Sequence, residues 1–252
     1  MLEGAWALLL LAARRRTKTI VAIATTAIPS SSRSVCIGVC IPQRRNLRSD
    51  RGTGKCYAPR VSRVAERSKL TAAEYLAWER EQPVKHEFFD GEVFAMAGGS
   101  PRHNALCGRM IVVLNAALRG RGCVEFSSDQ RISIDHGVRY VYPDVSVVCG
   151  GVQLQEETRD VIVNPSIIVE VLSQGTEQYD RGLKWVSYQQ LPSLTDYVLV
   201  SQSETRIEHY RREPAGRWSY RSFGPGERIE LTSGAALEVD AIFAGVFDLP
   251  GD

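Results

Sequence analysis

The sequence predicts an α/β protein with a central mixed β-sheet, helices on the faces of the sheet and additional β-hairpins. Three patterns predict this class. Residues 166–172 form an apolar run typical of a buried strand, residues 176–191 have the pattern of a helix that stops before Pro192, and residues 196–202 form another apolar strand. Two strands joined by a helix usually pair in parallel through a right-handed crossover, so this unit places the centre of the sheet.

The charges divide the chain into two parts. Residues 1–60 contain eleven Lys and Arg against two acidic residues, a net charge of +9, whereas residues 61–252 hold 20 basic and 27 acidic residues, a net charge of −7. The first part has the composition of a transit peptide, a disordered basic arm or sequence that is not naturally translated. We favour the last and expect a folded domain over residues 61–252. The acidic body gives no support for general nucleic-acid affinity.

The six cysteines are also divided, three in each part, and none forms a CxxC pair. We therefore expect Cys107, Cys123 and Cys149 to be buried free thiols of a cytoplasmic protein, and we expect no zinc site. The apolar run of residues 5–13 is too short to span a bilayer, so no membrane association is expected.

The elements that precede the core have clear local signals. Thr71 and Glu74 form a capping box at the start of a short helix. Asp90-Gly91 separates two alternating runs within residues 86–96, which predicts a hairpin. Ser100 and Pro101 provide an N-cap and a first helical position, so a longer helix should run to about residue 118.

The remaining elements follow from apolar alternation. Strands are expected at 123–134 and 139–149, and a loop at 150–163. Beyond the central unit, residues 205–212 and 217–223 should pair with each other, and residues 227–248 should form a last short hairpin and an apolar terminal segment.

The most informative position is Glu170, because it lies inside the apolar strand predicted at residues 166–172. A carboxylate is rarely buried without a partner. Asp144 similarly opens the apolar stretch 145–148, and Lys184 lies on the helix that follows Glu170. Two carboxylates with waters and a phosphate satisfy Mg²⁺, or Mn²⁺ in its place, and a lysine can orient the nucleophile or stabilise negative charge at the phosphate.

Each of these residues also has an ordinary interpretation. Asp144 follows Pro143 and could be a turn residue. Glu170 could belong to a structural buried ion pair. Lys184 lies four residues after Asp180, and an exposed helix pair of this kind contributes only ~0.3–0.5 kcal/mol.

Further candidates surround this group. His103 lies in the first turn of the helix that starts at Pro101, where it could contact a phosphate or a metal-bound water, or simply face solvent. Glu87 is a candidate additional metal ligand, although a cross-strand partner for Arg or Lys is its more common role. Tyr179 and Tyr188 flank Lys184 and by default pack in the core.

At these residues a resemblance is visible. Pro143-Asp144 followed by Glu170-Val171-Leu172 resembles the PD-(D/E)XK signature of restriction-endonuclease-like nucleases, with Leu172 where that signature has lysine. One branch of that superfamily carries the lysine on the following helix, which suits Lys184. More closely, the chain resembles the Uma family of putative restriction endonucleases. The matching stretches are Phe89–Val93, Ser100–Asn104, Tyr142–Asp144, Val169–Ser173, Tyr179–Arg181 with Lys184, and Tyr197–Val200.

The resemblance covers roughly residues 70–212. It implies a restriction-endonuclease-like core and a metal-dependent site that cuts DNA, and such an enzyme cuts both strands most simply as a homodimer. Two alternatives stay open. A nuclease-like fold that binds nucleic acid or protein without cutting would fit the missing strand lysine, and a two-carboxylate glycosidase would leave Lys184 unexplained.

Overall fold

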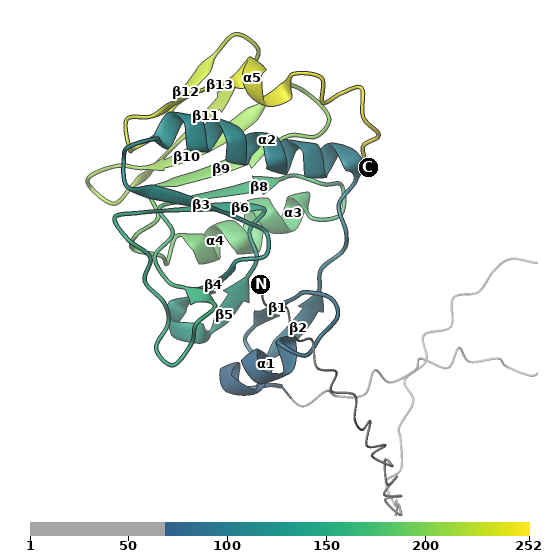
Figure 1. Cartoon of the computed structure of the whole chain (residues 1–252), viewed down its shortest axis with the longest axis vertical. Coiled ribbons are helices and arrows are strands. Elements are labelled where there is room, and N and C mark those ends of the chain that lie inside the picture. The colour runs from purple at the N-terminus through teal and green to yellow at the C-terminus, as the bar shows by residue number, and fades with distance from the viewer. Residues whose placement is uncertain (1–68) are drawn as a thin grey trace, which may run out of the picture. The chain divides into compact units, whose positions relative to one another are not determined.

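The structure is a computed structural model that describes residues 69–252 (Figure 1). The expectations for residues 1–60, and the cysteines at positions 36, 40 and 56, lie outside the described residues. Within the described part, no helix has both the length and the apolar character needed to cross a bilayer.

Helices separate groups of strands along the described part of the chain. The helices are α1 (Ala72–Glu79), α2 (Pro101–Leu118), α3 (Glu177–Tyr179), α4 (Trp185–Tyr188) and α5 (Val239–Phe243), with a 3₁₀ turn at Asp135–Gly137 and a π-helical turn at Asp180–Lys184. The strands are β1 (His86–Phe89), β2 (Glu92–Ala95), β3 (Cys123–Ser127), β4 (Arg131–Ile134), β5 (Arg139–Val141), β6 (Val145–Cys149), β7 (Val161–Ile162), β8 (Ile167–Val171), β9 (Asp196–Val200), β10 (Ile207–Arg212), β11 (Trp218–Phe223), β12 (Arg228–Glu230) and β13 (Ala236–Glu238).

The central sheet confirms the predicted mixed sheet. Its strand order is β11-β10-β9-β8-β6-β3, and β8 and β9 pair in parallel while their neighbours in the sheet pair antiparallel. The helical segment 177–188 connects the parallel pair, as the strand–helix–strand pattern predicts. The pair β10–β11 is the predicted hairpin at the sheet edge.

A second sheet has the order β2-β1-β5-β4-β7, and β12 and β13 form a separate hairpin. This sheet corrects two expectations. The predicted strand 123–134 is two strands, because a turn at 128–130 moves the chain from the central sheet to the second one. The predicted strand 139–149 is also two strands, because Pro143 cannot donate a ladder hydrogen bond and the chain crosses back to the central sheet there.

The predicted helix 176–191 is also interrupted. Its middle is the π-helical turn Asp180–Lys184, between the short helices α3 and α4. Asp180 and Lys184, four residues apart, both lie on the buried side of this segment. The sequence pattern predicted the position of the helix but not this change of winding.

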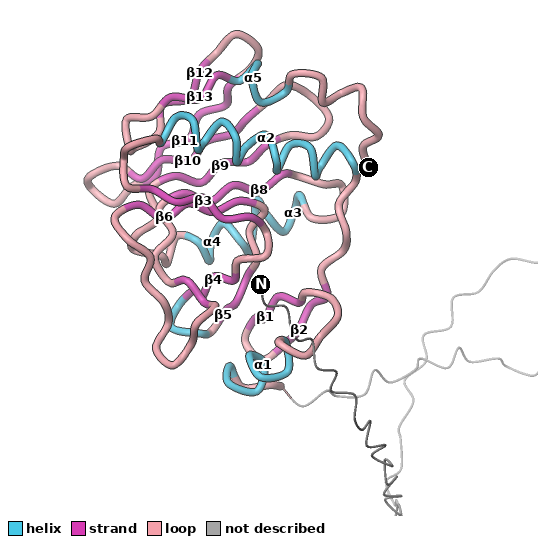
Figure 2. The backbone as a smooth tube through the Cα atoms, viewed as in Figure 1, coloured by secondary structure: helices cyan, strands magenta, loops and turns pink. Residues whose placement is uncertain are grey.

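Apolar side chains cover both faces of the central sheet. Figure 2 shows the helices α2 and α4 on opposite sides of that sheet. One face is covered by α2, α5 and the β12–β13 hairpin. There α2 packs against the strands through Leu106, Met110, Leu114 and Leu118. On the other face α4 and residues of β4 and β5 pack around Tyr197. A smaller core joins α1 to the second sheet. The site described below lies where these layers meet.

The local signals are confirmed at the start of the folded part. Thr71 caps α1 in a capping box with Glu74, and Ser100 caps α2 with Pro101 in its first turn. The β1–β2 hairpin turns through Asp90 and Gly91, which have φ values of 45° and 88°. Both central residues of such a two-residue turn need positive φ, and Asp-Gly is a favoured pair for it.

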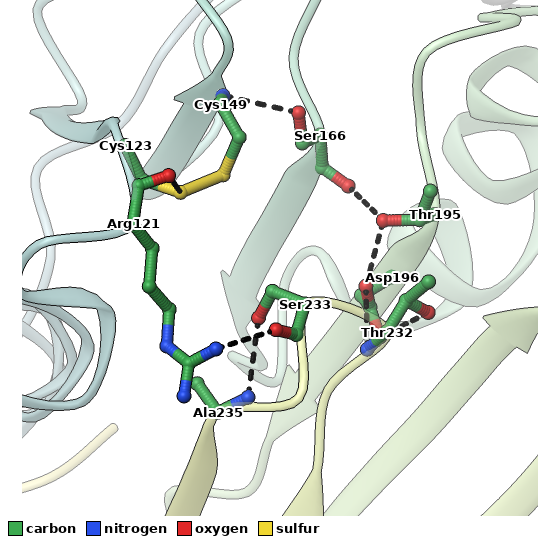
Figure 3. The surroundings of a disulfide bond; sticks show 9 residues. All are labelled: Arg121, Cys123, Cys149, Ser166, Thr195, Asp196, Thr232, Ser233 and Ala235. Atoms are coloured by element: carbon green, nitrogen blue, oxygen red, sulfur yellow. Dashed lines mark hydrogen bonds between the residues drawn. A yellow bond between two sulfur atoms is a disulfide. The ribbon is translucent and has the colours of Figure 1, made fainter.

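The expectation of free thiols is wrong for two cysteines. Cys123 on β3 and Cys149 on β6 are direct cross-strand partners, with Cα atoms 4.0 Å apart, and they form a disulfide (Figure 3). Directly opposed side chains lie on the same side of the sheet, and this pairing is not visible in the spacing of the two residues. Cys107 is a free cysteine.

We predict that the disulfide stabilises the folded chain, because it closes a loop with a sequence separation of 26 residues. A Cys123→Ser/Cys149→Ser variant should lose about 2–4 kcal/mol of unfolding free energy, measured by urea denaturation under oxidising conditions. Reductant should lower the stability of the parent chain by a similar amount and leave the double variant unchanged. Equal stability of the two proteins without reductant would show that the bond contributes nothing in solution.

Candidate active site

Two carboxylates meet at one end of the central sheet. Strands β6 and β8 are antiparallel with Val145 opposite Val169, so Asp144, just before β6, faces Glu170 near the end of β8. The backbone N–H of Asp144 donates to Glu170 Oε2 at 3.4 Å, and the N–H of Val171 donates to Asp144 Oδ2 at 2.8 Å. The two strands therefore hold both carboxyl groups at the same sheet end.

Lys184 is buried, so its interpretation as an exposed helix residue is wrong. Its side chain is 8% exposed, and Nζ donates to Glu170 Oε1 at 3.1 Å. The same nitrogen lies 3.1 Å from Glu87 Oε1 and 3.5 Å from Asp180 Oδ1. One ammonium thus serves three buried carboxylates, which arrive from β1, β8 and the π-helical turn.

The ammonium does not satisfy all of these oxygens. Glu87 Oε1 and Asp180 Oδ1 are buried and lie within ion-pair distance of Lys184, yet neither contact has hydrogen-bond geometry. The residue opposite Glu87 on β2 is Phe94, so the cation that Glu87 meets is Lys184 rather than a cross-strand partner. Together with Asp144, the site carries more carboxylates than cations.

The pKa values follow from this imbalance. Burial raises the pKa of Glu170 from 4.5 to about 8, and the charges of Asp180 and Asp144 add to the effect while Lys184 opposes it. Burial likewise raises the pKa of Asp180. For Lys184, burial acts to lower the pKa, but Glu170, Glu87 and Asp180 outweigh it and raise the pKa well above 10.5. Lys184 is therefore an ammonium at neutral pH.

Two tyrosines complete the surroundings of Lys184. Tyr188 Oη donates to Glu170 Oε1 at 2.7 Å, and the Lys184 ammonium lies 5.5 Å from the centroid of the Tyr179 ring. Tyr188 also belongs to the apolar core below α4. Its expected packing role is therefore correct but incomplete, because its hydroxyl fixes the orientation of the Glu170 carboxylate.

His103 reaches the site from the first turns of α2. Its Nε2 lies 3.2 Å from Asp144 Oδ2, and its side chain is 15% exposed, so the solvent-facing alternative is wrong. Burial acts to lower the pKa of His103, but the hydrogen bond and charge of Asp144, with a contribution from Asp252, outweigh it and raise that pKa. His103 Nδ1 faces the free thiol of Cys107 at 3.5 Å.

The structure thus brings together Asp144, Glu170, Lys184, His103 and Glu87. Sequence reasoning gave Asp180 only a role as a surface partner and treated Cys107 only as a buried thiol, not as a site residue. The spacing in the sequence could have identified each of these two residues. Asp180 stands four residues before the lysine of the site, and Cys107 stands four residues after His103 on the same helix.

The comparisons with known proteins show the family of the chain. Residues 72–242 match the model of the Uma2 family, described as "Putative restriction endonuclease". The chain belongs to the Uma2 family. Two uncharacterized proteins of Synechocystis sp. (strain ATCC 27184 / PCC 6803 / Kazusa) are similar to it. The first is 39% identical to this chain, over 71% of this chain and 93% of its own length. The second is 36% identical, over 62% of this chain and 88% of its own length.

A solved structure also matches. The crystal structure of a protein of Anabaena variabilis ATCC 29413, described as a putative nuclease belonging to DUF820, aligns with a TM-score of 0.59 and 19% identity, over 70% of this chain and 99% of that one. At this identity the likeness shows the fold, and it confirms the restriction-endonuclease-like core of this Uma2 protein.

We predict that the stability of the metal-free protein falls as pH rises. The folded state keeps a proton on Glu170 between 4.5 and about 8 that the unfolded state releases, so this stabilisation is present below 4.5 and lost through that window. The raised pKa of His103 acts in the same direction above 6.5, whereas Lys184 loses its proton only above 10.5.

The unfolding free energy in EDTA should therefore drop by more than about 1 kcal/mol between about pH 6 and about pH 8.5. A Glu170→Gln variant should show a flatter profile, and Glu230→Gln, which alters an exposed carboxylate, should keep the parent profile. Urea denaturation at several pH values measures this. Identical slopes for the parent and Glu170→Gln would mean that Glu170 ionises normally in the fold.

We predict that Lys184→Ala is strongly destabilising, contrary to the small loss expected for an exposed helix pair. It leaves three buried carboxylates without their cation, and breaking a buried pair in this way costs about 3–5 kcal/mol. Lys69→Ala, which breaks the exposed pair with Asp90, should cost less than about 1 kcal/mol. Chemical denaturation of the two variants side by side measures the difference, and equal losses would contradict it.

Proposed function

We propose that this Uma2 protein is a metal-dependent endonuclease that hydrolyses DNA phosphodiester bonds, with Asp144 and Glu170 as ligands of Mg²⁺ or Mn²⁺. The observation that carries the proposal is the meeting of these two carboxylates at one sheet end, with the Lys184 ammonium on Glu170. The family match supports a nuclease, and DNA is the substrate that the family description suggests.

The donor set fits a hard divalent cation. Carboxylate oxygens are the ligands that Mg²⁺ and Mn²⁺ prefer. Both protein contacts of the Asp144 carboxylate use Oδ2. Glu87 would have to exchange its contact with Lys184 to become a further ligand. A bound ion would lower the pKa of a water molecule and neutralise charge on the phosphate.

The two cations of the site, Lys184 and His103, act through their positive charge in this proposal. Since the pKa of Lys184 is raised, its side chain does not serve as a base; it donates hydrogen bonds that hold Glu170 and offers positive charge to the phosphate. The raised pKa of His103 also favours its charged form. From the beginning of α2, its Nε2 contacts the Asp144 carboxylate. Both residues therefore act by binding and orientation.

The absence of lysine at position 172 does not weaken the proposal. Leu172 is buried and packs in the core below α4, and the ammonium reaches Glu170 from Lys184 instead. Glu170 thus has the cationic neighbour that the family signature supplies from the strand. The alternative of a nuclease-like module that does not cut becomes one outcome of the assay below. We further propose that the protein cuts as a homodimer, which light scattering can test.

We predict that Asp144→Asn and Glu170→Gln each lower metal-dependent cleavage by at least roughly a hundredfold, because each removes a charged ligand. The assay measures nicking of supercoiled plasmid DNA with Mg²⁺ or Mn²⁺, and with EDTA as a blank. Glu230→Gln is the matched control, since it changes an exposed acid on β12 and should keep full activity.

Folding has to be measured in parallel. Unfolding free energies near or above that of the parent would separate a lost ligand from a lost fold. Glu170→Gln should keep stability, since burial raises the pKa of Glu170 to about 8 and the neutral amide then replaces a carboxyl group that is protonated at neutral pH. Parent protein that cuts no DNA or RNA with any divalent ion, with variants that unfold, would assign the cluster to structure and favour the module that does not cut.

A further inference from the structure

A second group of metal-ligating side chains adjoins the proposed magnesium ligands. His103 and Cys107 are four residues apart on α2 and so lie on the same side of that helix, and Asp144 approaches from the start of β6. One ring nitrogen of His103, the Sγ of Cys107 and a carboxylate oxygen of Asp144 lie within 4.8 Å of one another. None of the three residues is fully exposed or fully buried.

The size of this group is close to that of a tetrahedral metal site. Metal–ligand bonds of about 2.0–2.3 Å place neighbouring ligand atoms roughly 3.3–3.8 Å apart. The observed separations include 3.2 Å between His103 Nε2 and Asp144 Oδ2 and 3.5 Å between Cys107 Sγ and His103 Nδ1. These two contacts use different ring nitrogens, so a bound ion would have to bring one ring nitrogen close to both partners. The spread of the three ligand atoms, up to 4.8 Å, would then shrink by about 1 Å.

The chemistry of the ligands selects the metal. A thiolate and an imidazole favour Zn²⁺ and Co²⁺ over Mg²⁺, and three protein ligands leave one position for water. We propose that His103, Cys107 and Asp144 bind a thiophilic divalent cation such as Zn²⁺. The neutral imidazole, the thiolate and the carboxylate then carry two negative charges, which the ion balances. The expectation of no zinc site considered only cysteine pairs and could not anticipate a single cysteine beside His103.

This site shares Asp144 with the proposed magnesium site. Zinc bound by His103 and Cys107 would withdraw Asp144 from Mg²⁺, so zinc should inhibit the nuclease competitively with Mg²⁺. The inhibition rests on the proposed function, whereas zinc binding itself does not. Its test therefore uses a spectroscopic signal rather than activity.

Cobalt is the probe for this site. The chelator-treated full chain is titrated with Co²⁺, and the expected result is one bound ion with thiolate-to-cobalt charge-transfer absorption in the near ultraviolet. Cys107→Ser should remove this absorption and weaken Zn²⁺ binding, measured by competition with a chromophoric chelator, by roughly ten- to a hundredfold. The three cysteines of residues 1–60 are present in both proteins, so the difference reports Cys107 alone.

Glu170→Gln separates the two sites. It should weaken Mg²⁺ binding and leave the cobalt–thiolate absorption in place. An unchanged absorption in Cys107→Ser, or none in the parent chain, would overturn the zinc site. A chain that binds Co²⁺ through Cys107 but cuts no nucleic acid would support the zinc site and contradict only the proposed nuclease.

Discussion

The arrangement of the two sheets depends on the buried ammonium of Lys184. Its three carboxylate neighbours come from β1 of the second sheet, from β8 of the central sheet and from the π-helical turn, so one cation joins three separate elements. Taking charges out of water costs several kcal/mol per ion, and only good mutual contacts offset that cost. The second sheet is therefore held against the central one by charge as well as by apolar packing, and its position is coupled to the ionisation of the site.

A second constraint acts on the segment before Asp144. Tyr142, two residues before Asp144, is held through its hydroxyl group. This hydroxyl donates to Glu79 Oε1 at 2.9 Å and accepts from Arg131 Nε at 2.8 Å. Pro143 then ends the pairing of the second sheet, and β6 begins in the central one. Because the chain is fixed on both sides of Asp144, the carboxylate is positioned by the fold before any ligand binds, as a rigid site requires.

Local signals predicted much of this fold, and they failed where long-range contacts decide. Caps, the Asp90-Gly91 turn and the strand–helix–strand unit depend on neighbours in sequence, and they appear as expected. The division of 139–149 between two sheets depends on where the strands find partners. The burial of Lys184 depends on Glu87, which lies 97 positions earlier in the chain. Periodicity carries no information about such a contact, so an exposed ion pair with Asp180 was the natural expectation.

The location of the lysine shows how a site can keep its chemistry while its signature changes. A lysine at position 172 would share the strand face of Glu170, two residues away, because side chains alternate along a strand. Here Leu172 uses that place to pack in the core below α4, and the ammonium comes from the following helix. Asp180 and Lys184, both in the π-helical turn, are buried together, so the same segment supplies the cation and one of its carboxylate partners. What the chemistry requires is a cation on Glu170, and the fold can provide it from either element.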